Sequence, residues 1–178
     1  MKKPILLAVL GLIGLLLTAA NPAPAYRDLA LNPDDVHEAG CGYPHATSNS
    51  ETRNEPCYWA INALKGYRNN LHHGPQYPSW GPEQRTDLWW KVDFGRSVEV
   101  DKVVLHIRAD FPHDGWWHAG TLVFSDGSKV RIAIKKTAEP QVYEFPKRKT
   151  AWVTITDLEQ DLPLMWCALT AVEIWGRE

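Results

Sequence analysis

The chain has 178 residues, a formal net charge of −2, nine tryptophans and thirteen prolines. A net charge this close to zero gives no electrostatic reason to expect nucleic acid or an anionic membrane as a partner. The prolines favour a loop-rich architecture with few long helices, and the tryptophans suit either a large core or a binding face.

The first 25 residues have the layout of a secretory signal peptide. Lys2 and Lys3 precede an apolar run at 5–17, which is too short for an ordinary transmembrane helix. Small residues follow, and cleavage fits after Ala20 or Ala25. The alternative is an uncleaved membrane anchor. We expect a protein that is secreted or periplasmic, with no membrane span after cleavage.

The rest of the chain predicts one domain, 40–178, after a linker or N-terminal extension at 26–39. Within the domain, 58–64 predicts a short helix that ends near Gly66. The stretch 67–85 has three prolines and little periodicity. A loop of this length in a small domain is usually functional or acts as a lid.

Three cysteines, Cys41, Cys57 and Cys167, lie in the predicted domain. Export makes a disulfide an expected feature. Three pairings are open, and each leaves one thiol over. No cysteine spacing resembles a zinc site.

After Arg85 the pattern becomes that of β-strands. Residues at 89–94 end at a glycine, and those at 103–108 alternate between an apolar and a more polar face. The Asp-Gly at 126–127 predicts a hairpin between two short strands, 121–124 and 130–134. Further strands are expected at 141–145, 152–156 and 168–175. Short strands at this spacing predict an all-β sandwich or barrel.

Between two of these strands lies a loop, RADFPHDGWWHAG, that is dense in aromatic and polar side chains. Loops at strand ends often carry binding groups on a rigid scaffold. Adjacent tryptophans in an extended chain point in opposite directions. We therefore expect one of Trp116 and Trp117 to enter the core and the other to be available to a ligand.

The motif WWKVDFGRSVEVDKVVLHIR, the turn SDGS and the closing ALTAVEIWG together resemble the signature of the discoidin, or coagulation-factor C-type, domains. NALKG at 62–66 stands where that family usually has Asn-Ala-Ile-Asp-Gly. The resemblance covers about 41–176. It implies a galactose-binding-like jelly roll, an all-β sandwich of about eight antiparallel strands. Bacterial members are commonly secreted carbohydrate-binding modules, while others bind phospholipid head groups or proteins.

The resemblance also implies a structural calcium ion in many members, and this sequence departs from that pattern. Carboxylates come there from the Asp of Ile-Asp-Gly and from a Glu in the last strand. Lys65 and Ala171 stand at these positions here. A hard dication needs several oxygen ligands. We therefore expect no calcium and no other cofactor, unless Glu173 takes the place of Ala171.

The resemblance implies a ligand site on loops at one end of the sandwich. There an aromatic ring packs under the apolar face of a sugar, and polar groups bind its hydroxyls. The ligand-binding residues that we predict are Trp80, Arg85, Arg108, His113, Asp114, Trp116 and Trp117. Two alternatives are open. Trp80 can plug the end of the sandwich, and the arginines can form structural ion pairs with Asp87, Asp110 or Asp114.

We therefore predict a secreted, non-catalytic domain that binds carbohydrate, and the sequence does not name the sugar. One alternative is a cell-surface or periplasmic protein-interaction module. A second is a glycan hydrolase using Asp110 and Asp114, although catalytic signatures such as GxSxG and HExxH are missing from the sequence. A zinc site is a further, weak alternative; it would be built from His72, His73, His113 and His118.

Overall fold

The computed structural model describes residues 24–38, 42–68, 78–109 and 115–178. These residues form seven strands: β1 (Arg27–Asp28), β2 (His45–Ser48), β3 (Trp90–Ile107), β4 (Ala119–Phe124), β5 (Lys129–Ala133), β6 (Gln141–Glu159) and β7 (Leu169–Arg177). Three short 3₁₀ helices lie between β2 and β3: η1 (Thr52–Asn54), η2 (Pro56–Tyr58) and η3 (Ala60–Leu64). The expected short helix at 58–64 is thus divided into 3₁₀ turns.

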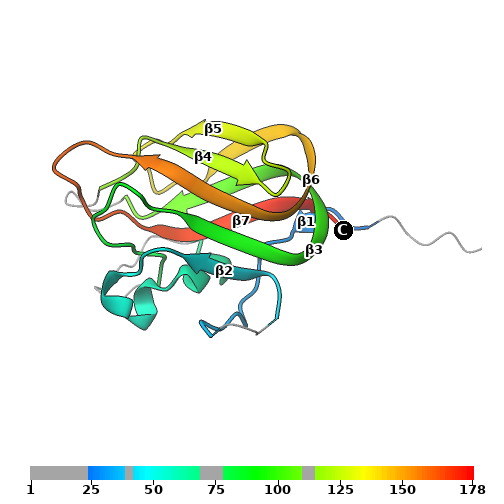
Figure 1. Cartoon of the computed structure of the whole chain (residues 1–178), viewed down its shortest axis with the longest axis horizontal. Coiled ribbons are helices and arrows are strands. Elements are labelled where there is room, and N and C mark those ends of the chain that lie inside the picture. The colour runs from blue at the N-terminus through cyan, green and yellow to red at the C-terminus, as the bar shows by residue number, and fades with distance from the viewer. Residues whose placement is uncertain (1–23, 39–41, 69–77, 110–114) are drawn as a thin grey trace, which may run out of the picture.

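The described strands form one antiparallel sheet that folds over into a sandwich, with the order β1-β7-β3-β6-β4-β5 and β2 paired with β3. The long strands β3 and β6 bend and serve both layers (Figure 1). In one layer, 90–93 of β3 pair with β2 and with 152–155 of β6. In the other, 98–107 of β3 pair with β7 and 141–150 of β6. The predicted all-β sandwich is confirmed.

A bulge in β3, beyond the bend at 94–97, is visible in the strand's burial pattern. Trp90, Val92 and Phe94 are fully buried, as are Val103 and Leu105 further along. The inward positions change from even to odd because the register with β6 and β7 shifts between 100 and 102. One extra residue moves every following side chain to the other face of the strand. The bulge therefore keeps apolar side chains in the core on both sides of the bulge itself.

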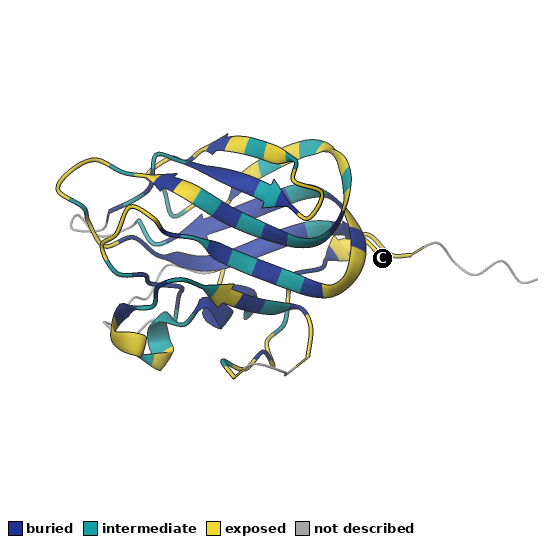
Figure 2. Ribbon diagram, viewed as in Figure 1, coloured by how far each residue is buried: buried dark blue, intermediate teal, exposed yellow. Residues whose placement is uncertain are grey.

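Tight turns and close packing complete the frame. Gly127 has a φ of +81° in the β4–β5 hairpin, as the Asp-Gly pair predicts. Segment 26–38, expected to be a linker or extension, packs on the sandwich through β1, with Leu29 and Ala30 buried. Cys57 and Cys167 are not joined by a disulfide, and Cys41 lies outside the described residues. Buried residues alternate with more exposed ones along the strands (Figure 2).

Candidate functional site

Three described segments meet at the end of the sandwich opposite the C-terminus (Figure 1). The β6–β7 loop, 160–168, is central among them. Gln84 Nε2 donates to the Leu164 carbonyl at 2.6 Å, which ties the segment before β3 to this loop. Gly115 N donates to the Trp166 carbonyl at 2.9 Å, which ties in the β3–β4 connection. We call this assembly of 79–88, 115–118 and 160–168 the loop end.

Gly115 allows the closest approach within the loop end. A Cβ atom at this position would lie 2.4 Å from Met165 Cβ and 3.1 Å from Cys167 Sγ. Carbon atoms do not approach this closely without repacking, so a larger residue would push the two loops apart. The glycine in the sequence Asp-Gly-Trp-Trp is therefore needed for packing.

Two tryptophans predicted as ligand contacts lie in the core beneath the loop end. Trp80 is 0% exposed and Trp117 is 1% exposed. Their rings stack with centroids 5.7 Å apart and planes inclined by 22°. Backbone hydrogen bonds join Trp80 to Leu169 in both directions, at 2.8 and 2.9 Å. Because long-range pairing with the start of β7 draws Trp80 inward, it is a plug, and neither ring offers a face to solvent.

Trp116 is the member of the Trp-Trp pair that faces outward. It is partly buried against the core. The Lys136 ammonium lies 5.3 Å from its ring, and the His118 ring lies 5.4 Å away and tilted by 59°. His118 in turn lies 3.4 Å from the Asp161 carboxylate. The ring is thus surrounded by polar groups that can reach a ligand placed over it.

The exposed apolar side chains of the loop end come from the β6–β7 loop, which sequence reasoning missed. Leu162 is 79% exposed, Trp166 is 44% exposed and Met165 is 38% exposed. This loop forms the exposed tip at the left of Figure 2. The signal was present in the run LPLMW, since consecutive apolar residues around a proline are unusual for a loop just before a closing strand. Trp166 offers the largest exposed ring face on this loop.

The two arginines of the predicted site have different roles in the structure. Arg85 is exposed and forms two hydrogen bonds with Asp87, with Nε to Oδ1 at 2.8 Å. The Arg85 guanidinium lowers the pKa of Asp87 from its usual value of 3.8. Arg85 thus forms the structural ion pair with Asp87 that the sequence offered as the alternative to a ligand contact. Arg108 is partly buried, and its backbone N–H donates to the Ala168 carbonyl at 3.0 Å.

Several predicted residues lie outside the described residues: His72, His73, Asp110, His113 and Asp114. The proposed contacts of His113 and Asp114, the zinc alternative and the carboxylate pair of the hydrolase alternative all depend on this group. Within the ranges that the structure describes, there is no group of three or more His, Cys, Asp or Glu side chains that could hold a metal ion. In those same ranges, no helix is long and apolar enough to cross a membrane.

Lys65 stands where the sequence resemblance aligns a calcium-binding Asp, and its ammonium meets two backbone carbonyls. Lys65 Nζ donates to the carbonyls of Asp35 at 2.9 Å and Pro33 at 3.3 Å. Ala171 is buried and brings no oxygen ligand. The nearby Glu173 carboxylate is held by three groups, each at 2.8 Å: His106 Nε2, Arg68 Nε and Trp175 Nε1. A cation thus already meets these carbonyls, and the Glu173 carboxylate is engaged elsewhere.

The family model described as Domain of unknown function (DUF7402) matches residues 41–161. A search of curated proteins gives no match.

Solved structures similar to this chain include the family 32 carbohydrate-binding module of C. perfringens NanJ in complex with galactose, with 12% identity and a TM-score of 0.61 over 85% of this chain and 100% of that chain. A fucose-binding module of Streptococcus pneumoniae, SpX-3, has 15% identity and a TM-score of 0.62 over 85% of this chain and 98% of that chain. Chitosan-binding module 1 of a chitosanase/glucanase from Paenibacillus sp. IK-5 has 19% identity and a TM-score of 0.56 over 84% of this chain and 98% of that chain. At these identities the likeness shows the galactose-binding-like fold.

Proposed function

We propose that this chain, which belongs to the DUF7402 family, is a secreted, non-catalytic domain that binds carbohydrate at its loop end. The observation that carries the proposal is the exposed ring of Trp166 on the loop that joins the other two segments of the loop end. Similar folds in a galactose complex and in a fucose-binding module support it. The apparent signal peptide in the sequence supports secretion.

Aromatic and polar groups together give the loop end the chemistry that a sugar needs. A pyranose has an apolar C–H face that packs on an aromatic ring, and a rim of hydroxyls that must keep hydrogen bonds when it leaves water. Trp166 and Trp116 supply rings, and His118, Asp161 and Lys136 supply donors and acceptors beside Trp116. A shallow site of this kind buries little ligand surface, so we expect a Kd of roughly 0.1–1 mM for one sugar.

We further propose that the domain works without the calcium ion found in many members of the discoidin family. The Lys65 ammonium supplies positive charge to the carbonyls of Pro33 and Asp35. A fixed ammonium satisfies these oxygens as a bound cation would, and it does not depend on the calcium concentration. His113 and Asp114 are kept in the proposal as further ligand contacts of the β3–β4 connection.

A glycan array followed by calorimetric titration tests the proposal. We expect binding to at least one neutral glycan, and we expect the Trp166→Ala variant to weaken it by roughly five- to thirty-fold. Tyr43→Ala is the matched control, because Tyr43 is a 60% exposed aromatic residue that packs on Gly95, outside the loop end. Folded protein that binds no glycan on the array would overturn the proposal.

A protein-interaction module is the second candidate, and the exposure of Leu162 favours it. A side chain of this kind, 79% exposed beside Met165 and Trp166, is more typical of a protein contact than of a sugar contact. The Leu162→Ser variant separates the two functions. Carbohydrate binding at the tryptophans predicts little change in glycan affinity, whereas a protein partner that docks on this tip would be lost.

A further inference from the structure

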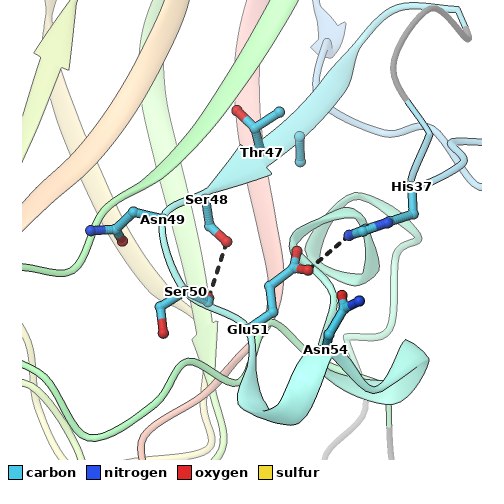
Figure 3. A pocket seen from close by; sticks show the side chains of 8 residues that line it. His37, Thr47, Ser48, Asn49, Ser50, Glu51 and Asn54 are labelled. Atoms are coloured by element: carbon cyan, nitrogen blue, oxygen red, sulfur yellow. Dashed lines mark hydrogen bonds and ion pairs between the residues drawn. The ribbon is translucent and has the colours of Figure 1, made fainter.

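A second concave site lies along β2, outside the loop end. It has a volume of about 310 Å³ and faces solvent beside the 3₁₀ helix η1 (Figure 3). Its lining consists of His37, Ala46, Thr47, Ser48, Asn49, Ser50, Glu51 and Asn54. We call it the β2 pocket. None of these residues belongs to the three segments of the loop end.

The β2 pocket opens on the free edge of β2. Within the part of the chain that the structure describes, this strand pairs with β3 alone. On the other side, the Ala46 N–H donates to the Asp35 carboxylate at 3.1 Å. Because backbone groups alternate in direction along an antiparallel pair, the N–H and C=O of Ser48 also point away from β3. The pocket therefore contains a backbone donor and a backbone acceptor that the sheet does not use.

The charged and titratable side chains of the β2 pocket already have hydrogen-bond partners. His37 Nε2 lies 2.8 Å from Glu51 Oε2, as Figure 3 shows, and the Ala60 N–H donates to Glu51 Oε1 at 2.7 Å. The His37 ring stacks on Trp59 with centroids 4.0 Å apart, which fixes its orientation. Among the described residues, the lining includes no lysine or arginine. An anionic ligand would therefore find no unpaired cation in this lining, and a cationic ligand would find a carboxylate that is already engaged.

The groups left for a ligand are neutral donors and acceptors. The Trp59 indole N–H donates to Asn54 Oδ1 at 3.2 Å, which holds the amide and leaves its Nδ2 to donate elsewhere. Thr47 is exposed and brings a hydroxyl from the outer face of β2. With the Ser48 backbone, these groups offer hydrogen bonds of both directions across a cavity of the size of a small ligand site.

We infer that the β2 pocket binds a neutral, hydroxyl-rich ligand, one sugar residue in size. Hydroxyl groups both donate and accept, so they match a pocket that offers hydrogen bonds of both directions from neutral groups. This inference does not depend on binding at the loop end, because no residue is shared. If both sites are active, one domain can engage two residues or branches of a glycan, and the second contact raises the overall affinity by effective concentration.

An ¹⁵N–¹H NMR titration of the whole protein tests the inference with three separate probes: galactose, fucose and N-acetylglucosamine at millimolar concentration. We expect at least one probe to shift the amide signals of Ser48 and Asn49 and the side-chain NH₂ signal of Asn54. These shifts should persist in Trp166→Ala. In the spectrum of the parent protein the Trp166 indole signal reports on the loop end, so failure at one site is distinguished from failure at the other.

Two variants and one control make the test specific. Thr47→Tyr places a ring in the pocket at an exposed strand position that tolerates aromatic residues, and it should remove the shifts. Ala133→Tyr, at an exposed position on the edge strand β5, should leave them unchanged. Asn54→Asp keeps the acceptor for Trp59 but replaces the donor, and should weaken binding by about tenfold or more. Folded protein with no shift for any probe, or shifts that survive Thr47→Tyr, would overturn the inference.

Discussion

The stacked pair of buried tryptophans and the exposed Trp166 predict opposite outcomes for the same substitution. Trp117 is 1% exposed and stacks on Trp80 beneath the loop end, whereas Trp166 is 44% exposed on the β6–β7 loop. Truncating a buried tryptophan to alanine costs about 3–5 kcal/mol, because packing is lost and a cavity remains. For a domain of this size that cost lowers the Tm by roughly 6–20 °C.

Trp166→Ala should instead leave the Tm within about 2 °C of the parent, because surface substitutions cost little. Its effect should be on binding. Loss of one stacking ring removes about 1–2 kcal/mol, which weakens glycan affinity by roughly five- to thirty-fold. Thermal unfolding followed by circular dichroism measures the first effect, and calorimetric titration with a glycan identified on the array measures the second.

Two results would refute these roles of the tryptophans. If Trp117→Ala unfolds at the temperature of the parent, the ring is not part of the core that supports the loop end. If Trp166→Ala unfolds like the parent and binds glycan with unchanged affinity, the exposed ring is not the platform. Either result would require a different assignment of the tryptophans.

Three further predictions concern stability. Lys65→Met should lower the free energy of unfolding by about 1–2 kcal/mol, since two carbonyls lose a charged donor. Neither calcium nor a chelator should move the Tm of the parent protein. A Tm that depends on calcium would contradict the proposed calcium independence. Gly115→Ala should lower the free energy of unfolding in urea by about 1–3 kcal/mol, because the added Cβ would clash with Met165. An unchanged urea midpoint would show that the two loops separate freely. Burial raises the pKa of Asp28 above its usual 3.8. Protonation therefore favours the folded state, so the stability of the parent relative to Asp28→Asn should fall as the pH rises from about 4 to 7; a constant difference would contradict this.

Much of the fold could be predicted because local patterns decide it. The Asp-Gly turn and the alternating residues of β3 correctly placed the central strands and the β4–β5 hairpin. The predicted strands 141–145 and 152–156 are one continuous strand, β6, as 89–94 and 103–108 largely are in β3. Gly95, with a φ of +66°, reads as a turn in sequence but is a bend within the ladder. Chain-local signals cannot distinguish a bulge from a turn when the partner strand is unknown.

The candidate site was less accessible to sequence reasoning because exposure depends on long-range contacts. Trp80 lies among prolines like a loop residue, yet pairing with Leu169 buries it completely. Trp166 lies just before the closing strand like a core residue, yet its loop projects from the end of the sandwich. β2 was missed because its four residues, HATS, carry no distinctive strand pattern. The β2 pocket was missed for the same reason.

The most direct measurement of the central claim is the set of nine tryptophan indole N–H signals during titration with a glycan identified on the array. Binding at the loop end predicts that the Trp166 signal shifts most and saturates, that the Trp116 signal follows, and that the signal of the fully buried Trp90 stays in place. Saturable binding that leaves the signals of Trp166 and Trp116 unmoved would contradict the claim.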